Sequence, residues 1–146
     1  MRIPVIGSFF VLCFSLNASA SWNGAWRGTM LRKYCNYSNS SCPERSDTST
    51  LVISTNGSKL SILETTTNFN EDFKMENGTL RYYGNVVGTY TDHKISFIFK
   101  GTNNNGCDQT TEIARTRTGV NFDQNFPCRS ANFKHFVKGS LDVLLP

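Results

Sequence analysis

Hydrophobic and polar positions alternate along the stretch from residue 22 to residue 31. One face of this stretch carries Trp22, Gly24, Trp26, Gly28 and Met30. A spacing of two places successive side chains on opposite faces of a strand, so the pattern predicts a strand with one buried face. Glycine weakens a strand, and Gly24 and Gly28 beside the large indole of Trp26 therefore predict a close backbone approach or a bend where a barrel closes.

Three turn sequences join further strand-like segments. They are Asn56-Gly57 between residues 50–55 and 58–63, Asn77-Gly78 between residues 73–75 and 79–83, and Asp92-His93-Lys94 between residues 86–91 and 95–100. An Asn-Gly pair supplies the two positive φ angles of a type I′ turn. Each Asn-Gly pair therefore predicts a two-residue turn between antiparallel strands.

The rest of the chain continues the pattern of short strands. Up to four more come from residues 110–122, the segment around Cys128, residues 132–138 and residues 140–145. No stretch of about ten or more residues shows helical periodicity with caps, although residues 132–145 leave room for one short helix. About eight to ten short strands joined in sequence predict an all-β fold, and a single antiparallel up-and-down β-barrel in preference to a sandwich.

The N-terminal segment has the layout of a secretory signal peptide. Arg2 gives it a basic start, residues 3–16 form an almost unbroken apolar run, and Ala18-Ser19-Ala20 is the small-x-small pattern that a signal peptidase cleaves. Residues 1–20 are thus predicted to be removed after Ala20, leaving residues 21–146 as a single secreted or periplasmic domain. The apolar run is shorter than the roughly 20 residues of a spanning helix, so no membrane span is expected.

Four cysteines remain after the leader, namely Cys35, Cys42, Cys107 and Cys128. An even number in an exported chain predicts two disulfides that staple the barrel. Of the three possible pairings, Cys35 with Cys42 and Cys107 with Cys128 are favoured, because each closes one hairpin locally. A zinc site is the competing interpretation, but the cysteines lack the usual metal-ligand spacing and neighbouring histidines, so no metal is expected.

A family resemblance rests on the first strand. Gly24-Ala25-Trp26, followed by a chain of hairpins in an exported cysteine-bearing domain, resembles the calycins, and among them the lipocalin-like barrels. The resemblance implies that Trp26 plugs the closed end of the barrel and that a basic residue of a late strand packs over it. Arg115, Arg117 and Lys134 are the candidates for that residue.

In a later segment two arginines alternate with other residues so that they lie on the same strand face as an apolar residue. Ile113, Arg115 and Arg117 share one face of a strand. If Ile113 points inward, both guanidinium groups point inward too, and they need an acidic partner or an anionic ligand such as a fatty-acid carboxylate. If Ala114 points inward instead, both arginines are solvent-exposed charges.

Aromatic residues on other strands are candidates for the lining of an apolar pocket. Tyr82, Phe97 and Phe99 are the principal ones. The alternative is plain core packing, because a barrel of eight strands can be filled by its own side chains.

Charge and candidate chemistry narrow the function classes. The formal net charge of +4 comes from scattered single residues, which argues against nucleic-acid binding. His93 and His135 have no evident nucleophile or carboxylate companion, and the one adjacent acidic pair, Glu71-Asp72, is expected in a solvated loop. Catalytic and phosphate-binding motifs are absent from the sequence, so neither an enzyme nor a cofactor is predicted.

The sequence therefore predicts a secreted lipocalin-like barrel that binds a small apolar or anionic ligand. The alternative is an exported protein-binding module, such as an enzyme inhibitor, that inserts the loop between Cys35 and Cys42 into a partner's cleft. A carrier requires a hollow apolar interior, whereas an inhibitor is compatible with a filled core and an ordered exposed loop.

Overall fold

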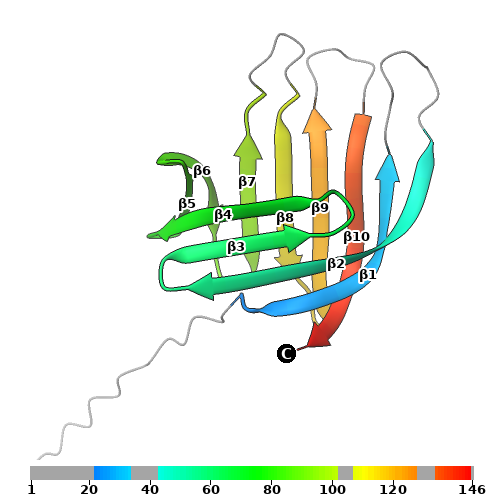
Figure 1. Ribbon diagram of the computed structural model, residues 1–146, viewed down its shortest axis with the longest axis horizontal. Coiled ribbons are helices and arrows are strands. Elements are labelled where there is room, and N and C mark those ends of the chain that lie inside the picture. Colours follow the sequence, from blue (N-terminus) through cyan, green and yellow to red (C-terminus); the bar gives the residue numbers. More distant parts are fainter. Residues whose placement is uncertain (1–21, 34–42, 102–106, 128–133, 146) are drawn as a thin grey trace, which may run out of the picture.

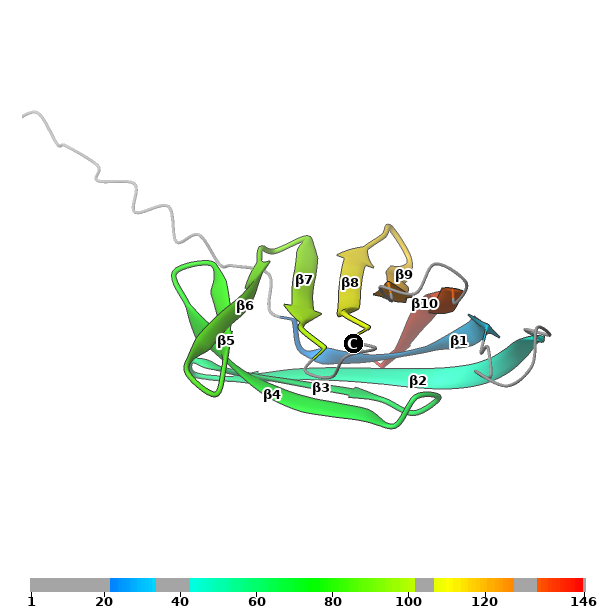
Figure 2. The same ribbon diagram turned by 90° about the horizontal axis from the view of Figure 1, so that it is seen from above.

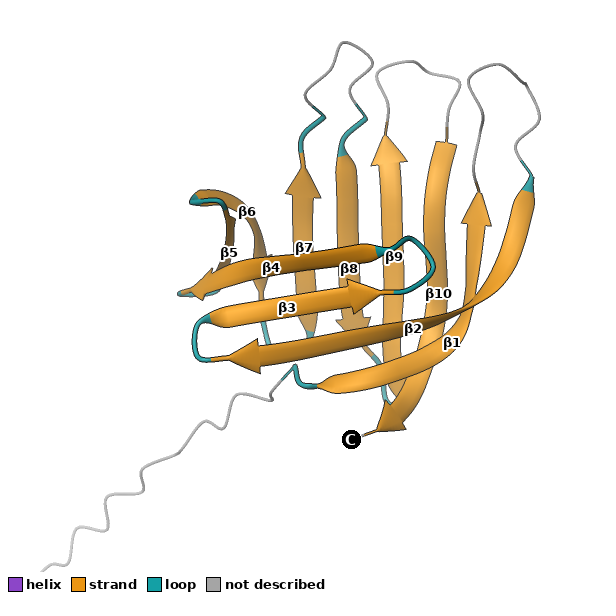
Figure 3. Cartoon of the chain, viewed as in Figure 1, coloured by secondary structure: helices purple, strands orange, loops and turns teal. Residues whose placement is uncertain are grey.

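The computed structural model describes residues 22–33, 43–101, 107–127 and 134–145. Within these ranges the chain forms ten strands, and no helix occurs (Figures 1 and 3). The strands are β1 (Gly24–Lys33), β2 (Glu44–Asn56), β3 (Lys59–Glu64), β4 (Phe69–Glu76), β5 (Thr79–Tyr82), β6 (Asn85–Tyr90), β7 (Lys94–Phe99), β8 (Gln109–Arg115), β9 (Gly119–Pro127) and β10 (Lys134–Leu145).

The strands form one closed barrel. Each strand pairs with its neighbours in the chain, and β10 closes the ring by pairing antiparallel with β1. This confirms the predicted all-β, antiparallel up-and-down barrel, and the architecture is compatible with a lipocalin-like calycin fold. The prediction of separate strands at residues 132–138 and 140–145 is wrong. Gly139 does not end β10, because it packs closely on β1, where a Cβ atom would lie 3.1 Å from the Cα atom of Met30.

Two glycines of β1 fit the predicted close approach at the point of closure. A Cβ atom on Gly28 would lie 3.0 Å from the Cα atom of Leu141 in β10, and one on Gly24 would lie 2.9 Å from the indole of Trp26. Distances this short are tighter than ordinary van der Waals contact. Glycine at these positions therefore lets β10 approach β1 and lets the Trp26 ring lie over the strand.

One of the two Asn-Gly sequences forms the predicted turn. Asn77 and Gly78 have φ angles of +48° and +79°, as a type I′ turn requires. The prediction for Asn56-Gly57 is wrong by one residue, because Asn56 pairs with Lys59 across the hairpin. Gly57, with a φ of +59°, is then the first central residue of the turn, which is the pattern of a type II′ turn.

Much of the barrel interior is filled. Met30, Leu51, Ile62, Ile95 and Ile113 come from five different strands, and each has an exposed fraction of 0%. Side chains buried to this degree have no water-sized space beside them. Along these residues the interior is a packed core and not the hollow chamber that a lipocalin-like carrier requires.

The pairing between strands is uneven around the barrel. The β1–β2 ladder runs from Gly24 with Ile53 to Lys33 with Glu44, whereas β4 and β5 share only three residue pairs, which begin at Lys74. β4 pairs with β3 from its first residue, so its first half is hydrogen-bonded on one side and diverges from β5 on the other. Seen from above, β5 and β6 lie at one end of the molecule, and the first residues of β2 lie at the opposite end (Figure 2).

Candidate functional site

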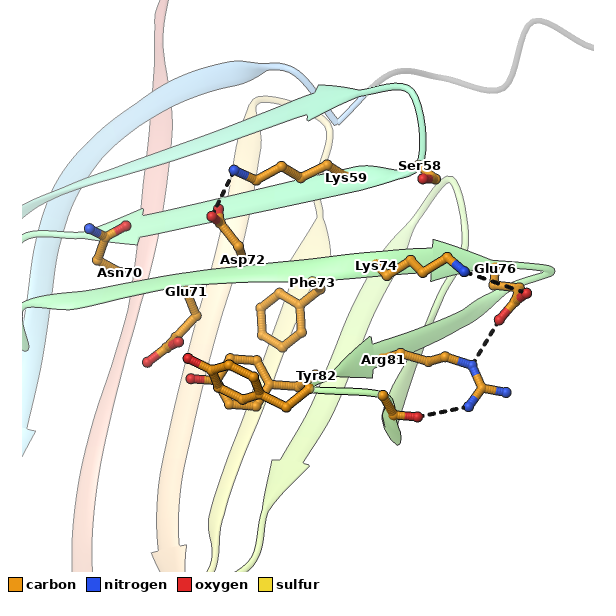
Figure 4. A pocket seen from close by; sticks show the side chains of 12 residues that line it. Ser58, Lys59, Asn70, Glu71, Asp72, Phe73, Lys74, Glu76, Arg81 and Tyr82 are labelled. Carbon is orange, nitrogen blue, oxygen red and sulfur yellow. Dashed lines mark hydrogen bonds and ion pairs between the residues drawn. The ribbon is translucent and has the colours of Figure 1, made fainter.

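An open pocket of about 870 Å³ lies where β4 and β5 diverge (Figure 4). We call it the β4–β5 pocket. It is lined by the β2–β3 turn, the start of β3, β4, β5 and the turn that follows β5. Its volume falls within the range of about 300–1,000 Å³ that is typical of small-molecule sites.

The alternation of β4 gives this pocket two chemically different walls. Glu71 is half-buried and Phe73 is buried. Asp72, between them, and Lys74, which follows Phe73, are exposed. Glu71 and Phe73 therefore lie on the inner face of the barrel, and Asp72 and Lys74 lie on its outer face. The sequence-based expectation that Glu71-Asp72 lies in a solvated loop is wrong, because both residues belong to β4.

The inner wall is aromatic and continuous with the core. The ring centroids of Phe73 and Phe97 are 4.7 Å apart, those of Tyr82 and Phe99 are 4.8 Å apart, and those of Phe73 and Tyr82 are 5.8 Å apart. The structure thus brings together Tyr82, Phe97 and Phe99, the three aromatic residues predicted for ligand binding. Tyr82 lines the pocket, whereas Phe97 packs behind it with only 1% of its surface exposed.

Tyr83 extends the aromatic wall from an unusual backbone position. Its φ is +46° and that of Gly84 is +82°, so the two residues form a type I′ turn between β5 and β6. The Tyr83 side chain is 89% exposed, and its ring meets that of Tyr82 edge-on at 4.5 Å. The sequence analysis missed this turn because its first central residue is Tyr instead of the usual Asn or Gly.

Glu71 and Tyr82 are coupled across the pocket. In Figure 4 the Glu71 side chain projects from β4 toward the Tyr82 ring. Hydrogen bonding to Glu71 raises the pKa of Tyr82 above its ordinary value of 10.0, and burial and the negative charge of Glu71 add to the rise. Tyr82 is therefore a neutral phenol beside the Glu71 carboxylate.

The outer rim of the pocket is a network of ion pairs. It consists of Lys59 with Asp72 at 2.7 Å, Arg81 with Glu76 at 2.8 Å and Lys74 with Glu76 at 3.9 Å. These side chains are all more than one-third exposed, so solvent screens the pairs and they add little to stability. Their importance is that each basic side chain of the rim already has an acidic partner.

The predicted arginine site lies elsewhere. The Arg115 guanidinium stacks 4.3 Å from the ring centroid of Trp22, and the Trp22 indole N–H donates to the Thr91 carbonyl oxygen at 2.7 Å. Arg117 follows the end of β8 and is exposed. Neither arginine lines the β4–β5 pocket.

The geometry at Trp22 also differs from what the family resemblance implies. The indole beneath Arg115 is that of Trp22, whereas Trp26, itself buried, lies against Gly24. The side chains of Lys134 and His135 lie outside the described part of the structure, and His93 is exposed in the β6–β7 turn.

A second inward carboxylate lies at the end of β3. Glu64 is fully buried and accepts hydrogen bonds from the hydroxyls of Ser49 and Thr67 and from the backbone N–H groups of Thr66, at 2.6 Å, and Thr67, at 2.8 Å. Burial alone would raise the pKa of Glu64, yet these hydrogen bonds together lower it below its ordinary value of 4.5. The sequence analysis missed this residue, which fixes the β3–β4 turn to β2.

Other predictions concern disulfides, a metal site and a membrane span. Cys35, Cys42 and Cys128 lie outside the described residues, as does the loop between Cys35 and Cys42. Within the described ranges no three His, Cys, Asp or Glu side chains are grouped so that they could hold a metal ion. No helix in the same ranges has the length and apolar character needed to cross a membrane.

The comparisons with known proteins add no relative. No protein-family model matches the chain. A comparison with curated proteins likewise finds no match. The fold and the site therefore define the class of protein by themselves, as a closed ten-stranded β-barrel with an open, aromatic-walled pocket between β4 and β5.

Proposed function

We propose that this protein is an exported, non-enzymatic β-barrel that binds a small and mainly apolar ligand in the β4–β5 pocket. The observation that carries the proposal is the aromatic wall of the pocket, in which Tyr82 and Tyr83 are accessible to solvent and the buried Phe73 packs behind Tyr82. Small-molecule sites combine such apolar walls with a few polar groups that fix the orientation of the ligand. Here Glu71 supplies the polar group.

The position of the ligand in this proposal differs from that in a carrier with a hollow barrel. The fully buried side chains of Met30, Leu51 and Ile113 fill their part of the barrel interior. The β4–β5 side offers space because β5 contributes only three residue pairs to β4. A ligand at this opening reaches the aromatic cluster without displacing the packed core.

An anionic ligand is the less favoured variant of this proposal. It depends on inward arginines as anchors, and the guanidinium of Arg115 is stacked on Trp22. Arg117 is exposed outside the pocket. Neither group is positioned to hold an anion at the aromatic wall.

Disulfide stapling forms part of the proposal for an exported protein. We propose that Cys107 forms one of the two predicted bridges, with Cys128 as its partner. Thr110 of β8 pairs with Asn125 of β9, and in the sequence Cys107 lies three residues before the first and Cys128 three residues after the second. Opposed residues of an antiparallel ladder have Cα atoms about 4.5–5.5 Å apart, which suits a disulfide.

The same relation supports the Cys35–Cys42 bridge and, with it, the second candidate function. Lys33 pairs with Glu44 at the end of the described β1–β2 ladder, and Cys35 and Cys42 stand two positions beyond. A bridge there would tie the intervening loop at its base, and a pre-ordered loop loses less entropy when it binds a protein partner. A mass four hydrogens below that of the reduced mature chain would establish both bridges.

The ligand proposal is tested first on mature protein from its own host. Native mass spectrometry with organic extraction is expected to show a small molecule at near-stoichiometric amount. Protein free of small molecules, captured instead with a protein bound to it, would favour the inhibitor function.

A second test locates the site. Calorimetric titration with 2-(2-naphthyl)ethanol is expected to show binding that Tyr82→Ala or Tyr83→Ala weakens by about tenfold, because each removes an aromatic contact. Val143→Ala is the matched control, since Val143 is 51% exposed on β10 and does not line the pocket. Equal affinity in all four proteins would exclude the β4–β5 pocket as the site.

A further inference from the structure

We propose that the β4–β5 pocket selects ligands that carry a protonated amine, which Glu71 binds while Phe73, Tyr82 and Tyr83 hold the adjoining apolar group. This inference rests on the proposed function and specifies its ligand class. It differs from the sequence-based expectation of an apolar or anionic ligand.

Charge is separated between the two walls of the pocket. Glu71 is the inward carboxylate of the pocket, whereas the basic side chains of the rim are on the outer face of the sheet. Lys59 and Arg81 are each held by an acidic partner at less than 3 Å. A ligand that enters from the opening therefore meets a negative group on the aromatic side and neutralised pairs on the rim.

The hydrogen-bonding state of Glu71 also bears on the ligand class. A carboxylate offers about four lone-pair sites. In the described part of the chain no basic side chain forms an ion pair with Glu71, and the neutral Tyr82 phenol lies beside it. The carboxylate therefore retains acceptor sites for an ammonium group.

The aromatic surface around that carboxylate bears on the ligand class as well. A cation is attracted to the face of a Tyr or Phe ring when it lies within about 6 Å of the ring centroid. Tyr82 has Phe73 at 5.8 Å and Tyr83 at 4.5 Å, so several rings adjoin the site of the charge. Aromatic rings beside a carboxylate favour an organic amine over a small inorganic cation, because they also bury its carbon atoms.

An anion is disfavoured by the same groups. A ligand carboxylate against the inner wall would face the negative charge of Glu71 without a free cation to balance it. The raised pKa of Tyr82 keeps its hydroxyl protonated, but this one donor lies beside the Glu71 carboxylate.

The test uses three probes with the same apolar group and different charge. These are 2-(2-naphthyl)ethylamine, 2-(2-naphthyl)ethanol and 3-(2-naphthyl)propanoate, titrated calorimetrically into the mature protein at neutral pH. The amine is expected to bind about tenfold more tightly than the alcohol, as for a charge-assisted hydrogen bond in a partly exposed site. The propanoate is expected to bind more weakly than the alcohol.

A pair of neighbouring variants separates the role of Glu71 from a general charge effect. Glu71→Gln is expected to abolish the preference for the amine over the alcohol, because the neutral amide no longer pairs with an ammonium group. Asp72→Asn removes the same charge one residue away on the outer face, and it is expected to preserve the preference. Thermal unfolding of both variants verifies that they are folded, and Glu71→Asp, which keeps the charge, is expected to retain part of the preference.

The outcomes distinguish the two proposals. If the alcohol binds in a manner that depends on Tyr82 and Tyr83 but the amine has no advantage, or Asp72→Asn removes as much of the advantage as Glu71→Gln, the amine selectivity is wrong and the proposed function stands. If no probe depends on the two tyrosines, both proposals are wrong.

Discussion

Two inward carboxylates on adjacent strands have opposite surroundings. Glu64, at the end of β3, is fully buried and accepts four hydrogen bonds from side chains and backbone of β2 and the β3–β4 turn. Glu71, in the first half of β4, is half-buried at an open pocket, with the neutral Tyr82 phenol beside it. The first carboxylate has its acceptor sites filled by the fold, whereas the second retains acceptor sites for a ligand.

The difference follows from the strands around each residue. β3 is paired along its full length with both β2 and β4, so the chain around Glu64 is fixed and brings donors to it. β4 separates from β5 ahead of Lys74, so β5 forms no backbone pairing beside Glu71 and the carboxylate stands at an opening. The comparison indicates that Glu64 serves stability and Glu71 serves recognition.

The largest expected effect is on the stability of the Glu64→Ala variant. Removing this carboxylate leaves the Ser49 hydroxyl and the turn N–H groups without their acceptor, and we expect a loss of about 2–4 kcal/mol in the free energy of unfolding. Urea denaturation measures the loss. Glu71→Ala is the matched variant, and an equal loss in both would break the comparison.

The pH dependence of stability is the second test. The pKa of Glu64 is lowered in the folded state, so its contribution is complete above the unfolded value near 4.5 and is lost as the pH falls through the lower, folded-state pKa. Urea denaturation from pH 6 to pH 3 is therefore expected to show the stability difference between wild type and Glu64→Gln shrinking with acidification. A difference that stays constant over this range would contradict the assignment.

A smaller effect, of opposite sign, is expected at Tyr83. A non-glycine residue in the left-handed region is strained, and Asn tolerates this conformation better than Tyr. Tyr83→Asn is therefore expected to raise the free energy of unfolding by about 0.5–1 kcal/mol while weakening naphthyl-probe binding. The Asn77-Gly78 turn offers the reciprocal control, because Asn77→Tyr places the same residue in the same type of turn and is expected to destabilise the fold without a change in binding.

The smallest effect is expected for the stability of Glu71→Gln. The amide keeps an acceptor for the Tyr82 hydroxyl, so the free energy of unfolding is expected to change by less than about 0.5 kcal/mol in urea denaturation. A loss comparable to that of Glu64→Ala would place Glu71 among the residues that hold the fold together.

The fold could be predicted from sequence to a large extent because a barrel depends on local signals. Alternation in β1 and β7 identified strands, and consecutive hairpins implied a closed ring. The position of the Asn56-Gly57 turn could not be predicted, because pairing either Thr55 with Ser58 or Asn56 with Lys59 puts the same side chains inside the barrel. Alternation specifies the face of a residue but not its cross-strand partner.

The candidate site was less accessible to sequence reasoning. Tyr82, Phe97 and Phe99 were identified by their residue type and their place on strands, and the structure brings them together. Glu71 and Glu64 were not identified as site residues. The sequence does not show whether a carboxylate faces water, accepts hydrogen bonds from neighbouring strands or keeps its acceptor sites for a ligand. The stacking of Arg115 on Trp22 could not be predicted either, because Trp22 and Trp26 lie on the same face and the sequence does not show which of them contacts Arg115.

The pairing of β1 with β10 has a consequence for folding. This ladder joins Ala25 to Leu145, so it closes the longest loop between described residues of the chain. Contacts this distant in sequence form slowly, because the entropy of loop closure must be lost before the contacts stabilise anything. Until β10 docks, the sheet exposes unpaired strand edges that can pair with another copy of the chain. The interval before β10 reaches β1 is therefore when this barrel is most exposed to aggregation.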